Sequence, residues 1–183
     1  MQAPAMAAKS AFRLRFEDLL AKAPSGTPRH YDFVRVPSNQ KPWLDTGIDL
    51  AAGETVTTIG SGQTLLTGTP LSFGADFQLW YRIGPGGQVF RGTRATNSFT
   101  VETPGRLYVA SYFPGEWSTR TGDLGTPDEA YQAVTGDLDM LILRWQGEPL
   151  EGLKRLAALG DVDHLLALEI DRLLNPVLPP KGW

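Results

Sequence analysis

The sequence predicts a mainly β protein: an antiparallel β-sandwich of eight or nine short strands, with an N-terminal helix and a C-terminal helical pair. Between His30 and Trp145, short runs of residues alternate between apolar and polar, which is the period of a β-strand. Turn residues separate these runs at regular intervals, in a chain that has 20 glycines and 14 prolines. The segments on either side instead repeat their apolar residues at helical spacing.

The first helix is expected over Phe12–Ala23. Its apolar residues fall on one face of a helix, its charged residues take the other positions, and Pro24–Pro28 ends it. Such an amphipathic helix either packs on its own domain or docks onto a partner or neighbouring domain.

The clearest strand is Phe77–Ile83, in which every second side chain is apolar and Trp80 lies on the opposite face. The turn at Gly84–Gly87 should return the chain into a second strand, Gln88–Gly92. The other expected strands, with Gly60–Gly62 as a hairpin turn between two of them, are Tyr31–Val36, Ile48–Leu50, Thr55–Ile59, Gln63–Leu66, Phe99–Val101, Leu107–Tyr112 and Asp137–Trp145.

The helical pair is expected after Pro149, a residue that suits the first turn of a helix. Gly160 separates the two helices, Asp161 is the expected N-cap of the second, and Asn175-Pro176 ends it. The Pro-Pro sequence that follows resembles a linker. The expected division is therefore residues 1–29 (helix and linker), 30–146 (β-sandwich) and 147–183 (helical extension leading to a further domain).

Composition excludes several classes of function. The net charge of −3 argues against a nucleic-acid binder, and the lack of cysteine excludes a disulfide scaffold and a thiol nucleophile. No apolar run is long enough for a membrane helix, and the first residues do not form a signal peptide. The expected location is the cytoplasm, with no membrane and no nucleic-acid partner.

No catalytic motif is found among the nucleophile elbows, zinc-binding helices and phosphate-binding loops. The pairs Asp137/Asp139 and Asp161/Asp163 resemble metal ligands, but both begin regular elements, where acids commonly cap helices or face solvent. We therefore expect no cofactor and no metal, and catalysis is the least favoured class of function.

The longest stretch without periodicity, Phe113–Gly136, is the expected ligand site, because long loops over a rigid sheet often bind ligands. Trp117 would stack on a sugar ring from the loop tip, where an indole carries little core packing. The other expected contacts, three from the loop and one from the outer face of the sheet, are Glu116, Arg120, Asp123 and Trp80.

Five short motifs resemble the strand-and-turn pattern of the PA-IL-like bacterial galactose-binding lectins, over about residues 43–143. They are Trp43–Ile48, Ala52–Val56, Gly60–Gly62, Tyr81–Gly84 and Gly105–Val109. The resemblance implies a galactose-binding-like β-sandwich that binds carbohydrate through calcium.

The chain departs from this family at its functional loops. Phe113 falls where the family has an aspartate that binds calcium, and Thr119 and Arg120 fall where it has an asparagine pair. A ring and a guanidinium do not ligate calcium, which requires oxygen ligands. The segment Gly68–Gly74 is also too short for the family's sugar-contacting loop. The resemblance therefore supports the fold, and a calcium-free site is expected.

Two functions remain open. The first is a non-catalytic binding module for carbohydrate or another small polar ligand, accessory to a larger protein. The alternative is a structural or protein–protein interaction module that uses its helical ends and outer sheet face. Exposure of Trp80 and Trp117 separates them, because open aromatic rings favour a ligand site and buried rings favour a scaffold.

Overall fold

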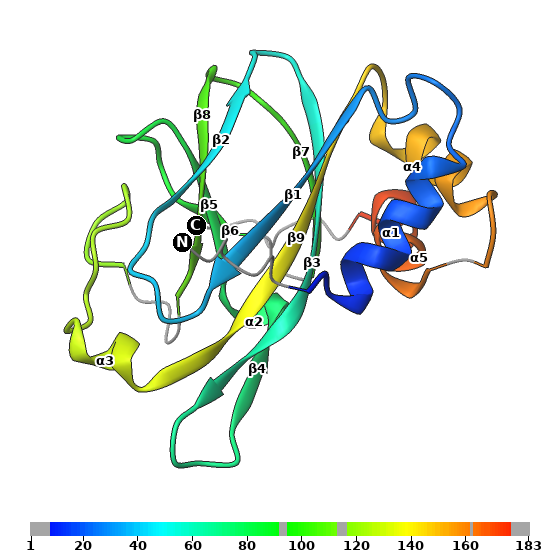
Figure 1. The fold of residues 1–183 in the computed structure, drawn as a ribbon. Coiled ribbons are helices and arrows are strands. Elements are labelled where there is room, and N and C mark those ends of the chain that lie inside the picture. Colours follow the sequence, from blue (N-terminus) through cyan, green and yellow to red (C-terminus); the bar gives the residue numbers. More distant parts are fainter. Residues whose placement is uncertain (1–7, 92–94, 113–116, 162, 177–183) are drawn as a thin grey trace, which may run out of the picture.

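The computed structural model describes residues 8–91, 95–112, 117–161 and 163–176. In this part of the chain nine strands form two antiparallel sheets that pack face to face (Figure 1). Sheet A consists of β1 (His30–Pro37), β9 (Val134–Trp145) and β3 (Thr55–Leu66), with both β4 (Ser72–Gly74) and β7 (Thr96–Thr100) on the far side of β3. Sheet B consists of β2 (Leu44–Leu50), β8 (Gly105–Ser111), β5 (Leu79–Ile83) and β6 (Phe90–Arg91). The predicted β-sandwich is confirmed.

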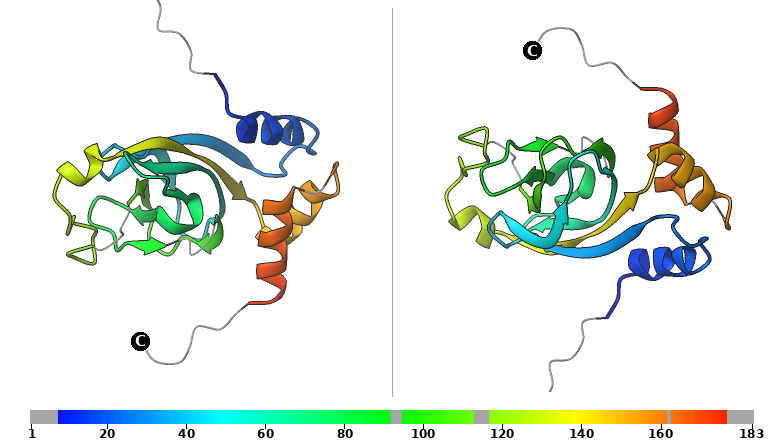
Figure 2. Two further views of the ribbon diagram at one scale, coloured as in Figure 1. Left: turned by 90° about the horizontal axis from the view of Figure 1, so that it is seen from below. Right: turned by 90° about the horizontal axis from the view of Figure 1, so that it is seen from above.

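Three helices gather at one end of the sandwich, against the outer face of sheet A (Figure 2). They are α1 (Ala11–Ala21), α4 (Pro149–Ala157) and α5 (His164–Leu174), while α2 (Ala75–Gln78) and α3 (Glu129–Gln132) are single turns in connections. None of the helices in the described ranges combines the length and the apolar character that crossing a membrane requires.

The central strand β9 supplies both apolar layers, because successive side chains of a strand point to opposite faces. One set faces sheet B, and the other faces the helices. The first comprises Leu138, Met140 and Ile142, and the second comprises Leu141, Leu143 and Trp145. Burying each of these side chains stabilises the fold by about 1.5–3 kcal/mol, so the continuous apolar run of β9 joins the sandwich to its helical cover.

Helix α1 packs on its own domain, one of the two arrangements that its amphipathic pattern allows. Phe12, Phe16 and Leu20 are buried in the same cluster as Leu141 of β9. The helix begins after Ser10, whose hydroxyl accepts a hydrogen bond from the Arg13 N–H at 3.1 Å. The outer layer of the core is therefore built by segments from both ends of the chain.

The prediction of a hairpin turn at Gly60–Gly62 is wrong. Strand β3 continues through these residues and pairs with β9 without interruption from Thr55 to Leu66. The glycines serve close packing instead. A Cβ on Gly60 would lie 2.5 Å from Leu79 Cδ1 of sheet B. Gly62 has φ +104°, and a Cβ there would lie 2.4 Å from the Asp137 carbonyl oxygen of β9.

Several element boundaries also differ from expectation, and at two of them a residue singled out in the sequence has another place. The strand expected from Phe77 begins at Leu79, because the preceding residues form α2, and Phe77 is 57% exposed. The cap of α5 is Asp163 rather than Asp161, and its carboxylate accepts from the Leu165 N–H at 2.9 Å. Both differences are local, and neither changes the strand order.

Candidate functional site

The predicted aromatic residues meet on the outer face of sheet B. Trp117 stacks on Trp43 with ring centroids 4.9 Å apart and planes at 15°, and its ring lies 5.8 Å from Trp80 and 4.4 Å from Tyr112. We call these four residues the aromatic cluster. Trp80 and Trp117 are both half-buried, so their rings pack chiefly on other rings of the protein.

The loop after β8 folds back to build this cluster. Trp43 Nε1 donates to the Gly122 carbonyl at 3.0 Å, and Trp80 Nε1 donates to the Tyr112 carbonyl at 3.2 Å. Gly122 has φ +88°, and a Cβ there would lie 2.5 Å from the Trp43 ring. Only glycine therefore fits this close approach of the loop to the ring.

Arg82 extends the cluster along β5. Its guanidinium lies 4.6 Å from the Trp43 centroid and 5.3 Å from that of Tyr108, and Nη1 donates to the Thr121 carbonyl at 2.7 Å. Burial lowers the pKa of Arg82 from its usual value. Arg82 thus ties the loop to the sheet.

The polar residues predicted for this site have different environments. Asp123 Oδ2 accepts from the Thr119 hydroxyl at 2.9 Å, which closes a turn within the loop. The Arg120 side chain is exposed, and its carbonyl accepts from the Val89 N–H at 2.8 Å. Glu116 and Phe113 lie outside the described residues. The structure therefore brings Trp80 and Trp117 together, while ligand binding by this loop stays a prediction.

Trp117 is not the loop-tip residue that the sequence suggested. We expect Trp117→Ala to lower the free energy of unfolding by about 2–3 kcal/mol, because three ring contacts are lost. The loss should stay below that of a fully buried tryptophan, since the Trp117 N–H is buried without a hydrogen-bond partner among the described residues and costs free energy already. Urea denaturation measures it. Arg120→Ala, an exposed change in the same loop, should shift stability by less than about 0.5 kcal/mol, and equal effects of the two changes would contradict the packing role.

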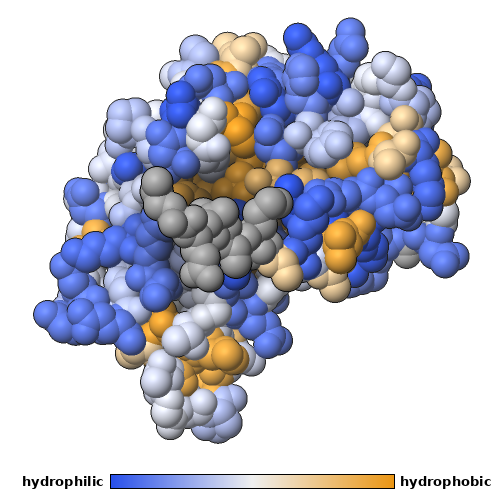
Figure 3. Space-filling model, viewed as in Figure 1, coloured by the Kyte–Doolittle hydropathy of each residue, from blue (hydrophilic) through white to orange (hydrophobic). Residues whose placement is uncertain are grey.

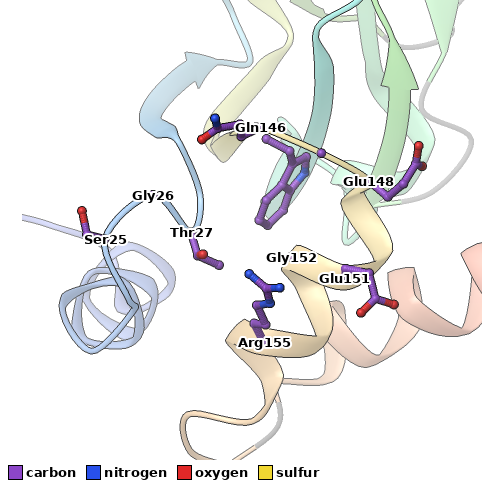
Figure 4. Close-up of a pocket in the computed structure, with 10 residues that line it drawn as sticks. Ser25, Gly26, Thr27, Gln146, Glu148, Glu151, Gly152 and Arg155 are labelled. Atoms are coloured by element: carbon purple, nitrogen blue, oxygen red, sulfur yellow. The ribbon is translucent and has the colours of Figure 1, made fainter.

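A polar pocket of about 370 Å³ opens where β9 ends and α4 begins (Figure 4). We call it the junction pocket. It lies between the α1–β1 connection and the first turns of α4. The lining residues are Ser25, Gly26, Thr27, Trp145, Gln146, Gly147, Glu148, Glu151, Gly152 and Arg155. The volume lies at the lower end of the range of about 300–1,000 Å³ that ligand pockets occupy.

Hydrogen-bonding groups of several kinds surround the junction pocket. Thr27 and Arg155 point toward one another across it, while Glu148 and Glu151 lie at its rim, at the start of α4, with their carboxylates directed outward (Figure 4). Arg155 is exposed and has no salt-bridge partner in the described part of the chain, whereas the neighbouring Lys154 pairs with Glu151 at 3.4 Å. The pocket thus presents hydroxyl, amide, carboxylate and guanidinium groups to solvent.

Trp145 forms the apolar wall of the junction pocket and is only 5% exposed. Its ring packs against Gly152 of α4, where a Cβ would lie 2.3 Å from Cζ3, so glycine is required at this position. Its Nε1 donates to the Thr57 hydroxyl at 2.8 Å. The indole is therefore held in place by the packing of its ring on α4 and by the hydrogen bond of its N–H.

A buried hydrogen-bond network continues from Trp145 to helix α5. The hydroxyls of Thr57 and Ser98 lie 2.7 Å apart, and Ser98 donates to Glu169 Oε1 at 2.6 Å. Glu169 is fully buried, and it also accepts from Thr96 and from Nε of Arg172 at 2.7 and 2.9 Å. The network links the wall of the pocket to the last described helix.

Sequence reasoning missed the junction pocket, although its central residues stand together in the chain. Gln146-Gly-Glu148 follows the apolar run of β9 directly and precedes Pro149. A short polar segment between a buried strand and a helix is a signal for such a site. Its other wall comes from Thr27, which no spacing along the sequence connects to Arg155.

Within the described ranges, no three histidine, aspartate or glutamate side chains lie close enough together to hold a metal ion. We expect EDTA to leave the melting temperature unchanged, because a bound ion would stabilise the fold by mass action and its removal would be visible. Scanning fluorimetry with EDTA and with added calcium tests this. A melting temperature that falls on chelation and recovers with calcium would contradict it.

No protein-family model matches the chain, and neither does any curated protein. Among solved structures, the chain is similar to the EclA N-terminal domain, described as a PllA-like lectin, with 16% identity and a TM-score of 0.42 over 61% of this chain and 94% of that one. It is also similar to a functionally unknown conserved protein mutant from Bacillus anthracis str. Ames, with 14% identity and a TM-score of 0.36 over 70% of this chain and 26% of that one. The assignment of a β-sandwich rests on the strand pairing and not on these likenesses.

Proposed function

We propose that the protein is a non-catalytic binding module for a neutral, hydroxyl-rich ligand of the carbohydrate class, held in the junction pocket and accessory to a larger protein. The observation that carries the proposal is the lining of this pocket, which combines hydroxyl, amide, carboxylate and guanidinium groups with the ring of Trp145. Sugar hydroxyls both donate and accept hydrogen bonds, so they suit such a mixed lining.

The charges of the pocket favour a neutral ligand over an ionic one. Glu148 and Glu151 accept hydrogen bonds from hydroxyls, while Arg155 donates them. A strongly anionic ligand would meet repulsion from the two carboxylates, and a cationic one would be repelled by the guanidinium. The Gln146 amide offers one donor group and one acceptor without adding charge.

The direct test is binding of the intact chain to a glycan array, followed by calorimetry with the sugars that bind. We expect Arg155→Ala to weaken binding of those sugars at least tenfold, while the exposed change Lys22→Ala, directly after α1, leaves affinity as it was. Arg120→Ala in the loop after β8 separates the two possible sites. Loss of binding on Arg120→Ala but not on Arg155→Ala would move the site to the aromatic cluster, and an array without any bound glycan would overturn the proposal.

A second candidate, a protein-interaction module, is favoured by one specific surface. The β3–β4 hairpin projects from the sandwich, carries apolar surface, and exposes Leu65 and Leu71 by 48% and 53% (Figures 1 and 3). No charged residue occurs between Thr55 and Ala75. One end of the outer face of sheet A, by contrast, is covered by the chain's own helices. Light scattering across a concentration series, with Leu71→Ser as the comparison, tests self-association through the hairpin.

A further inference from the structure

A second hollow of about 320 Å³ adjoins the junction pocket at the end of the sandwich. Both are lined by Trp145 and Gln146, so they lie on either side of this point of the chain. The second hollow, which we call the outer hollow, is otherwise formed by Arg29 and Arg144 and by the turn Ala51–Glu54. The turn after β2 and the end of β9 thus extend the surface of the junction pocket.

The groups of the outer hollow are already arranged by contacts within the protein. Arg144 Nε donates to Glu54 Oε1 at 2.6 Å, and the Ala51 N–H donates to Glu54 Oε2 at 3.0 Å. Burial acts to raise the pKa of Glu54, but these hydrogen bonds together hold the pKa below its usual value. The pair Arg144–Glu54 is therefore neutral as a unit and rigid, and it forms a polar wall without net charge.

Among the described residues, Arg29 is the cation of the outer hollow that has no salt bridge. Its side chain is exposed, and it acts on Glu54 through its charge without a salt bridge in the described part of the chain. Its main-chain N–H donates to the Arg144 carbonyl at 2.9 Å, so the backbone holds it in place. Arg155 in the junction pocket is likewise exposed and has no salt bridge in the described part of the chain. Within the described ranges, each hollow therefore contributes one guanidinium without a salt bridge, and Gln146 lies between them.

We propose that the two hollows form one groove that binds an extended neutral oligosaccharide across Gln146, with Arg155 and Arg29 each donating hydrogen bonds to a different sugar unit. This inference rests on the proposed function and specifies its ligand. A single sugar would occupy only one hollow. An oligosaccharide gains contacts in both at once, so its second contact is intramolecular and raises the affinity.

The test uses calorimetry of the intact protein with glucose, galactose, mannose and N-acetylglucosamine and with their neutral oligomers of increasing length. In the series that binds, affinity is expected to rise at least tenfold from the single sugar to the oligomers that span both hollows. Arg29→Ala is expected to remove most of this gain, whereas Arg155→Ala weakens binding at every length. Because Arg29 is anchored by its main chain, the variant should fold, and its thermal unfolding curve checks this.

The outcomes separate the two proposals. Affinity that does not change with oligomer length, or a gain that Arg29→Ala leaves intact, would overturn the groove while single-sugar binding still supports the junction pocket. Absence of binding by every sugar and oligomer would overturn the proposed function, and the groove with it.

Discussion

Replacing Trp145 with alanine is expected to lower the free energy of unfolding by about 3–5 kcal/mol and to abolish ligand binding. Trp145 is almost fully buried, joins β9 to the helices, and forms the wall of the junction pocket. Alanine would leave a cavity beside Gly152, which has no side chain to fill it. Chemical denaturation measures the change, and calorimetry with a bound sugar measures the second effect.

Trp145→Phe is the matched control for this change. It keeps an aromatic ring between β9 and α4 but removes the N–H that donates to the Thr57 hydroxyl. The lost hydrogen bond should cost about 1 kcal/mol, with a further loss for the smaller ring. If Trp145→Ala cost no more than Trp145→Phe, the ring would not carry the packing between β9 and α4.

The second large effect is expected at Glu169. Glu169→Ala should destabilise the protein by about 3 kcal/mol, because Thr96 and Ser98 lose the acceptor of their hydrogen bonds and Arg172 loses its ion pair. The cost should lie at the low end for a buried pair, since the Arg172 side chain is about a quarter exposed and regains contact with water. Chemical denaturation at neutral pH measures it.

Two further variants define what Glu169 does. Glu169→Gln retains an oxygen acceptor for one hydroxyl and loses the charge facing Arg172, so its cost should fall between wild type and Glu169→Ala. Combining it with Ser98→Ala should give a non-additive effect of about 0.5–3 kcal/mol, because the two residues share a hydrogen bond. Glu151→Ala, an exposed change on α4, should alter stability by less than about 0.5 kcal/mol. Additive effects of Ser98→Ala and Glu169→Gln would show that the network does not act as a unit.

The regular elements could be predicted because their physical cause is local. Alternation along β5 and the apolar centre of β9 follow from the period of a strand, and the helices follow from their apolar faces. The same local reasoning failed at Gly60–Gly62, since glycine marks both turns and places of close approach. Only the neighbouring Leu79 and Asp137 show that close packing is the reason here.

The candidate site, in contrast to the regular elements, could not be predicted from local patterns in the sequence. A tryptophan in a long loop indicated an exposed ring for ligand stacking at Trp117. The sequence does not show that Trp43, from the connection between β1 and β2, would cover this ring. The outer hollow depends in the same way on Arg29 and Glu54 meeting at the end of β9.

By itself, the sequence determined that this chain forms a β-sandwich with a helix before it and two after it, because the periods of its apolar residues are recorded along the chain. The tertiary structure alone decided where the pocket lies. Thr27, Gln146 and Arg155 come from a connection, a strand end and a helix, and they converge because β9 buries one face against sheet B and the other against the helices. Burial of two faces by one strand draws α1, α4 and α5 to the outer face of sheet A, and the pocket is the space left where the α1–β1 connection meets α4.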